Sequence, residues 1–276
     1  MKFTKYHALG NDYIVLDPKD LDREISSSDI KVLCDRHYGI GSDGVLYGPS
    51  KSKNCDFALR IFNPDASEAE KSGNGLRIFS RYLWDSGLVQ GDQFSIETKG
   101  GDVYSNIHNS GALVSVDMGK VGFSHKPDFF PDISPETIVL NDISFEFYRA
   151  NVGNPHCVIL VKELHPSLAK TYGQAIEEDG RFSNRTNVQF LNVIDRKNIQ
   201  IEIWERGAGY TLASGSSSTA SAAVAHALGL CGPEVSVHMP GGAIEITVNN
   251  DFYATMKGPV CKIGEGYLAR EALESF

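Results

Sequence analysis

The chain has 276 residues, of which 41% are hydrophobic and 22% charged, and a formal net charge of −9. This balance is typical of a folded protein and argues against a largely disordered chain. The negative charge has no accompanying basic stripe, which argues against a nucleic-acid partner. No apolar run is long enough to cross a membrane, and the first residues lack the apolar core of a signal peptide. We therefore expect a cytoplasmic protein with no membrane partner.

The first half of the chain carries one series of predicted elements. Alternating apolar residues predict a strand over 56–62, followed by a turn at Asn63-Pro64-Asp65. Helical periodicity predicts a helix over 76–88. Strands over 94–98 and 103–107 are predicted to form a hairpin.

The second half repeats this series in the same order. A strand is predicted over 200–204, and a helix rich in alanine and serine over 217–228. A second hairpin is predicted from strands over 235–238 and 244–248. The small side chains of the helix allow close packing, so we expect it at the centre of its lobe.

Matching motifs show that the two series are copies of one unit. The offset is 143 residues for Gly10 and Gly153, 142 for Ser72 and Ser214, and 141 for Gly100 and Gly241. This period is too long for a solenoid repeat. We expect an α+β protein of two pseudo-symmetric lobes, each a curved, mostly antiparallel sheet wrapped around a central helix. We expect the N-terminal lobe to comprise residues 1–118 and to be completed by the C-terminal segment 262–276. The C-terminal lobe is expected over 119–261, and its first residues, near 119–135, are expected to form the linker.

Both copies place a serine directly before a glycine at a predicted helix start, Ser72 and Ser214. The first turn of a helix carries unpaired N–H groups and partial positive charge, so it binds carboxylate or phosphate. Serine is also a favoured N-cap, and a purely structural role stays open. Because the feature recurs at matching positions, we favour a functional role. Ser72 and Ser214 would then lie on opposite walls of one cleft and act on a small molecule bound there.

Other polar residues near the turns are candidates for binding an amino acid. Glu205 and Arg206 would pair with an ammonium and a carboxylate, or with each other at the surface. His156 is either a buried structural histidine or an acid–base group. Asparagines occur in turns for local reasons, but together they would offer neutral donors and acceptors: Asn11, Asn63, Asn74, Asn154 and Asn187.

Cysteine and glycine patterns point to no metal or nucleotide. The five cysteines include no C-x-x-C pair, and their odd number indicates reduced thiols, which we expect to be buried. No zinc-binding spacing or phosphate-binding loop occurs. The glycines of 39–44 resemble a dinucleotide fingerprint only superficially, because the strand before and the long helix after are missing.

The ordered set of motifs resembles the diaminopimelate epimerase family. The matching segments are 3–12, 39–44, 63–69, 73–75 with Arg77, 153–156, 185–187, 205–207, 241–242 and 257–259. The resemblance implies epimerisation or racemisation at an amino acid's α-carbon, without pyridoxal phosphate or metal, most directly of LL- and meso-diaminopimelate in lysine and cell-wall biosynthesis. It implies substrate binding by Asn11, Asn63, Asn154, Asn187, Glu205 and Arg206, and α-carboxylate binding by the backbone of Gly73, Asn74, Gly215 and Ser216.

One departure from the family bears on the chemistry. The family uses two cysteines as base and acid, and serine stands at both positions, Ser72 and Ser214. A serine hydroxyl is a much weaker acid than a thiol, so we expect impaired two-base catalysis. The two serines could be native to a divergent branch of the family, or they could be deliberate replacements of the cysteines. Lys71 and Ser216-Ser217 also differ from the residues usual in the family, which favours natural divergence.

Three functions therefore stay open. The first is an epimerase that uses the two serines. The second is an isomerase or dehydratase of the same superfamily with one base, such as Lys71, His156 or a carboxylate. The third is a non-catalytic amino-acid-binding protein. A homodimer is an open question for all three.

Overall fold

The computed structural model describes residues 1–123 and 133–274, so the middle of the expected linker lies outside the described residues. The chain divides into two compact units, Met1–Val116 with Gly258–Phe276, and Asp117–Lys257. These are called unit 1 and unit 2. The chain passes between them within two strands, β8 (Leu113–Lys120) and β17 (Tyr253–Pro259).

Unit 1 is a mixed sheet with two main helices, of eight and 13 residues. Its strands pair antiparallel except for β2 with β3 and β4 with β6, which are parallel. A parallel pair needs a crossover, and α1 and α2 supply the two crossovers. The elements are β1 Lys2–Ala8, β2 Asn11–Leu16, α1 Ser27–Cys34, β3 Val45–Ser50, β4 Phe57–Phe62, β5 Glu68–Ala69, α2 Gly73–Asp85, β6 Gln93–Thr98, β7 Gly101–His108, β18 Cys261–Tyr267 and α5 Glu271–Glu274, with short 3-10 turns at Pro18–Asp20 and Asn109–Gly111.

Unit 2 repeats this plan. Its parallel pairs are β11 with β12 and β13 with β15, joined through α3 and α4. The elements are β9 Glu136–Leu140, β10 Ile143–Asn151, β11 Pro155–Leu160, α3 Pro166–Glu177, β12 Asn187–Asp195, β13 Asn198–Glu205, β14 Gly209–Thr211, α4 Gly215–Ala227, β15 Glu234–Met239 and β16 Gly242–Val248.

Strand registers match between the units. Val45 pairs with Phe62 in unit 1, and Val188 pairs with Trp204 in unit 2. The offsets between these pairs are the same as those between the sequence motifs. The predicted strands, helices and hairpins are all present, and the predicted fold class is confirmed.

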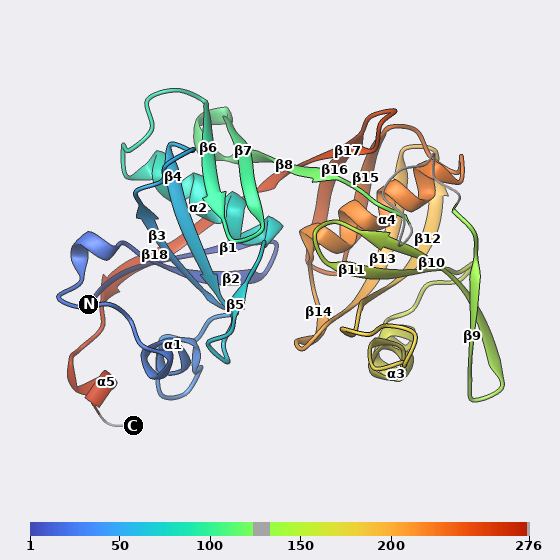
Figure 1. Cartoon of the computed structure of the whole chain (residues 1–276), viewed down its shortest axis with the longest axis horizontal. Coiled ribbons are helices and arrows are strands. Elements are labelled where there is room, and N and C mark those ends of the chain that lie inside the picture. The colour runs from blue at the N-terminus through green and yellow to red at the C-terminus, as the bar shows by residue number, and fades with distance from the viewer. Residues whose placement is uncertain (124–132, 275–276) are drawn as a thin grey trace. The chain divides into compact units, whose positions relative to one another are not determined.

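The helices α2 and α4 are the central helices, each surrounded by the strands of its own unit in Figure 1. Leu76, Ile78 and Phe79 of α2 are fully buried, as are Ala220–Ala225 of α4. Buried hydroxyls in these helices donate to the carbonyl four residues earlier, as Ser80 does to Leu76 and Thr219 to Gly215. The small side chains of α4 therefore fill the centre of unit 2, and most of its buried hydroxyls have hydrogen-bond partners. The buried Ser221 hydroxyl is an exception and has no partner among the described residues.

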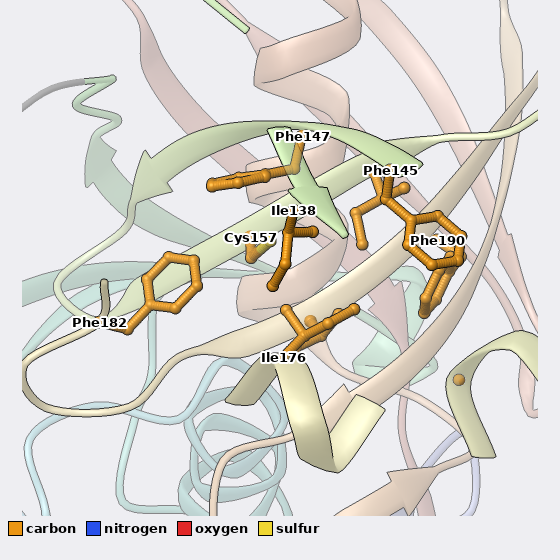
Figure 2. Close-up of a cluster of buried hydrophobic side chains, with 10 residues drawn as sticks. Ile138, Phe145, Phe147, Cys157, Ile176, Phe182 and Phe190 are labelled. Atoms are coloured by element: carbon orange, nitrogen blue, oxygen red, sulfur yellow. The ribbon is translucent and has the colours of Figure 1, made fainter. Parts of the chain in front are cut away.

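Each unit also has a helix on the other face of its sheet, which the periodicity analysis did not predict. In unit 2, α3 contributes Ile176 to a cluster with Phe145, Phe147 and Phe190 of the sheet (Figure 2). Gly173 lets α3 lie against Trp204, because an added Cβ would come within 2.5 Å of that ring. In unit 1, α1 packs in the same way through Ile30 and Leu33.

Two minor expectations have mixed outcomes. All five cysteines are free, but only Cys34, Cys157 and Cys231 are buried, whereas Cys55 is half-buried and Cys261 exposed. The expectation of buried thiols is wrong for Cys261, because it begins β18, a strand in which no side chain is buried. The glycines of 39–44 form a loop before β3, without the helix that a dinucleotide fingerprint requires.

Among the described residues, no helix has the length and hydropathy needed to span a membrane.

Candidate active site

The first half-site lies at the N-terminus of α2 and consists of Asn11, Tyr13, Ser72, Gly73 and Asn74. Ser72 is the N-cap, with φ −138° and ψ 116°, and its Oγ accepts a hydrogen bond of 3.1 Å from the Gly75 N–H. The helix therefore begins at Gly73, three residues before the predicted start at residue 76. The Ser72 cap stabilises the first turn, so the glycine-rich segment is helical. The Tyr13 hydroxyl lies 3.1 Å from Ser72 Oγ.

A chain of hydrogen bonds fixes the asparagines of this half-site. Asn74 Nδ2 donates to Asn11 Oδ1 at 2.9 Å, and Asn11 Nδ2 donates to Asp43 Oδ2 at 2.8 Å. Asn11 is placed by the two-residue hairpin turn before it, in which Leu9 and Gly10 both have positive φ. Each asparagine amide has four hydrogen-bonding positions. The network uses two of those on Asn11.

Arg77 lies beneath the α2 N-terminus and is completely buried. Its Nη2 donates to Asn74 Oδ1 at 2.6 Å, while Nε and Nη1 have no partner among the described residues. Burial lowers the pKa of Arg77 to about 10. The guanidinium thus keeps its charge at neutral pH and adds to the positive potential of the helix end.

The second candidate half-site lies at the N-terminus of α4, where Ser214 precedes Gly215 and Ser216. Asn154 and His156 lie just before and within β11, a strand that packs against α4. Ser214 is again the N-cap, and its Oγ accepts from the Ser217 N–H at 3.4 Å. Neither α2 nor α4 has an acidic residue in its first turn. Both helix ends therefore keep the partial positive charge that favours a carboxylate.

Glu205 ends β13 and Arg206 begins the turn to β14, and both residues are half-buried. Asn187 Oδ1 accepts from the Arg206 N–H at 3.1 Å, and Asn187 Nδ2 donates to the Pro155 carbonyl at 2.9 Å. The structure thus brings Asn187, Arg206 and the start of β11 together. The Arg206 guanidinium donates to the Asn184 carbonyl at 3.2 Å.

Glu177, at the end of α3, anchors the same turn and was not found by the sequence analysis. This buried carboxylate accepts from the Gly207 N–H at 2.9 Å, from Trp204 Nε1 at 2.7 Å and from Arg185 Nη1 at 2.9 Å. Three donors from two segments converge on one side chain. Glu177 therefore positions the turn that presents Glu205 and Arg206.

The remaining predicted residues are less enclosed. Asn63 is exposed in the turn between β4 and β5, and its Nδ2 donates to Ser67 Oγ at 2.9 Å. Lys71 is half-buried directly before Ser72. Asn63 and Glu205 occupy equivalent positions at the ends of β4 and β13, one per unit.

His156 is buried at the second position of β11, and its Nε2 lies 2.8 Å from Asn154 Oδ1. Burial lowers the pKa of His156 to about 3; the amide of Gln189 opposes this shift, and the positive charge of Arg206 adds to it. The imidazole is therefore neutral at physiological pH. This favours a structural role, or a role as a hydrogen-bonding group, over that of a proton carrier near neutrality.

The buried neutral His156 makes stability depend on pH. The unfolded imidazole binds a proton below about pH 6.5, whereas the folded one does not until about pH 3, so stability is lost as the pH falls between these values. We expect a loss of about 2 kcal/mol in the free energy of unfolding between pH 7 and pH 5, measured by urea denaturation. His156→Gln should remove most of this slope, and His37→Gln, at an exposed position, should keep it. An unchanged slope in His156→Gln would contradict the prediction.

The family model described as diaminopimelate epimerase matches residues 3–124 and 148–263. Diaminopimelate epimerase 2 of Nostoc sp. is 56% identical over 275 residues, with 98% of this chain and 96% of the relative covered. Diaminopimelate epimerase of Acinetobacter baylyi is 35% identical over 275 residues, with 97% of each covered.

Solved structures with low sequence identity share the fold. A probable proline racemase from Agrobacterium radiobacter has a TM-score of 0.73 at 15% identity, covering 98% of this chain and 93% of that one. A hydroxyproline epimerase from Agrobacterium vitis has a TM-score of 0.72 at 16% identity, covering 96% and 91%. With the full-length relatives and the family match, the conclusion is direct: the chain belongs to the diaminopimelate epimerase family, whose members are isomerases.

Proposed function

We propose that this protein epimerises diaminopimelate at its α-carbon, converting LL- into meso-diaminopimelate and back. The observation that carries the proposal is the pair of serine-capped helix N-termini, each without acidic residues in its first turn and each at the equivalent place of a duplicated unit. A helix end of this kind suits a carboxylate. An amino acid undergoing α-proton removal needs its α-carboxylate held while negative charge develops at the carbon.

The substrate groups are assigned by their chemistry. We propose that the N–H groups of Gly73, Asn74, Gly215 and Ser216 receive the α-carboxylate. Glu205 would pair with an ammonium group, and Arg206 with a carboxylate in bidentate geometry. The amides of Asn11, Asn63, Asn154 and Asn187 would complete the recognition of a zwitterion with two amino-acid ends.

The proton transfer is assigned to Ser72 and Ser214. One hydroxyl oxygen removes the α-proton and the other delivers a proton to the opposite face, which requires each oxygen within roughly 3–3.5 Å of the carbon. Serine is a poor acid and a poor base on its own, so the rate should lie well below that of a thiol pair. This weakness keeps a second function open, that of an amino-acid-binding protein that retains the site without turnover.

Deuterium exchange tests the proposal. The protein is incubated with LL- and with meso-diaminopimelate in D₂O, without added cofactor, and α-deuterium and stereochemistry are measured by mass spectrometry and chiral chromatography. We expect deuterium at the α-carbon and appearance of the other isomer. Calorimetric binding without exchange would favour the binding protein. Exchange without inversion would favour a single-base isomerase, and neither binding nor exchange would overturn the assignment of diaminopimelate.

Cellular location and assembly belong to the same proposal. The family's place in lysine biosynthesis supports a cytoplasmic enzyme, and we propose that it works there as a homodimer. Sedimentation at micromolar concentration separates the monomer of 30.2 kDa from a dimer.

A further inference from the structure

Ser72 has a hydroxyl neighbour that the proposed chemistry has not used. Tyr13 is 7% exposed and comes from β2, yet its hydroxyl lies 3.1 Å from Ser72 Oγ. Packing of the buried Tyr13 ring does not by itself require the hydroxyl. A phenol, with an ordinary pKa of about 10, is also a far better acid than an aliphatic alcohol.

We propose that Tyr13 is the positioning residue and proton-relay partner of Ser72, so that the acid–base group on this side is a tyrosine–serine pair rather than a lone serine. The proposal rests on the proposed epimerase function and deepens it. It addresses the main chemical difficulty of that function, which is that a serine hydroxyl needs a partner to accept or replace its proton.

The hydrogen bonds available to Ser72 Oγ allow two protonation states of the Tyr13–Ser72 pair, one that donates a proton to the substrate and one that accepts a proton from it. The oxygen has two lone pairs and one hydrogen, and the Gly75 N–H occupies one lone pair. If Tyr13 donates to the second lone pair, the serine hydrogen is left to give to the substrate. If Tyr13 is a phenolate and accepts the serine hydrogen, a serine lone pair is left to take a proton. The 3.1 Å contact is compatible with either direction.

The relay balances in atoms and charge. For proton delivery, the serine O–H bond breaks as a C–H bond forms at the substrate carbanion, and the Tyr13 proton moves to the serine oxygen. The neutral pair and the carbanion thus become a phenolate–serine pair and a protonated carbon. Proton abstraction is the reverse, with the phenolate as the final acceptor. No oxidant, reductant or further reactant takes part.

The repeat shows that this pair is specific to unit 1. Tyr13 follows Asn11 by two residues, as His156 follows Asn154, but His156 forms its hydrogen bond with Asn154. Within 1–123 and 133–274, no side-chain hydroxyl bonds to Ser214 Oγ. The two faces of the substrate would therefore meet unlike groups, and loss of the tyrosine hydroxyl should act on the Ser72 side alone.

Four enzymes test the relay: the parent, Tyr13→Phe, Ser72→Cys and the Tyr13→Phe/Ser72→Cys double variant. Steady-state kcat and KM for both diaminopimelate isomers are measured with calorimetric binding. We expect Tyr13→Phe to lower kcat by about 10²-fold or more with KM changed less than about threefold, since one acid–base group is lost. In the Ser72→Cys background the same change should alter kcat less than about threefold, because a thiol carries its own proton.

The control is Tyr82→Phe, which removes the hydroxyl of another buried tyrosine of unit 1, bonded to Asp17 at 3.2 Å. It should keep the parental kcat. Parental kcat in Tyr13→Phe would overturn the relay, and so would an equal loss in both backgrounds, because that pattern indicates packing. A parent without exchange on either isomer would instead refute the proposed function, which separates the two failures.

Discussion

Replacing Ser72 and Ser214 together by cysteine is expected to raise α-proton exchange of diaminopimelate by about 10²–10⁴-fold over the parent protein. Each new thiol would sit at the N-cap of a 13-residue helix with no acid in its first turn. That position stabilises a thiolate, which is the form that acts as a base. The change from Oγ to Sγ is close to isosteric, so the fold should tolerate it.

Each single cysteine variant should gain much less than the double variant, because inversion needs an acid and a base on different faces. Ser86→Cys is a matched control, since Ser86 is the C-cap at the opposite end of α2, where the helix dipole disfavours a thiolate. Its exchange rate should equal the parent's. Deuterium incorporation measured for all five proteins decides the matter. A folded, ligand-binding double variant as inert as its parent would show that the site has diverged beyond these two atoms.

Truncation of Arg206 is expected to weaken diaminopimelate binding by roughly 2–5 kcal/mol, which is about 30-fold to several thousand-fold in Kd. The loss reflects a substrate carboxylate left without its bidentate partner. The turn itself should survive Arg206→Ala, because its anchors are the Arg206 N–H on Asn187 and the Gly207 N–H on Glu177. Isothermal titration calorimetry gives the affinity directly.

Arg196→Ala provides the comparison for this variant. Arg196 belongs to the same unit and, like Arg206, donates from Nη1 to a backbone carbonyl, that of Gly229 at 3.4 Å. Its removal should leave the Kd unchanged. Equal affinities of Arg206→Ala and the parent would remove Arg206 from the binding site, and Arg206→Lys should fall between, because lysine keeps the charge without the planar pair of donors.

The parts of the fold that sequence analysis predicted are those with a local signal. The alternation in β4, the periodicity of α2 and the glycine turns of both hairpins all lie within a few residues. The α1 helix also carried such a signal, since Ser26 and Asp29 form a capping box. It was missed because only eight residues follow the cap, too few for periodicity to stand out.

Only those site residues that occur at matching positions in the two copies of the repeat could be predicted from the sequence. Ser72 and Ser214 were found because the repeat aligned them at two helix starts. Their partners come from distant segments: Tyr13 is 59 residues from Ser72, and Glu177 is 30 residues from Gly207. Such contacts depend on strand order and register, which no local pattern encodes. Comparing the residues two positions after each Gly-Asn motif would have singled out Tyr13.

The C-terminal end of the chain returns to unit 1, and this decides when during synthesis β1 acquires its second strand partner. Strand β1 pairs with β2 on one side and with β18 on the other, from Lys2 opposite Tyr267 to His7 opposite Cys261. Unit 2 is contiguous and lies between β1 and β18 in the sequence, so all of it is translated before β18. Until then β1 has an open hydrogen-bonding edge, the kind of surface that recruits strands from other chains. The edge of β1 therefore stays open throughout translation of unit 2, and a shortened chain lacking β18 keeps that exposed edge permanently.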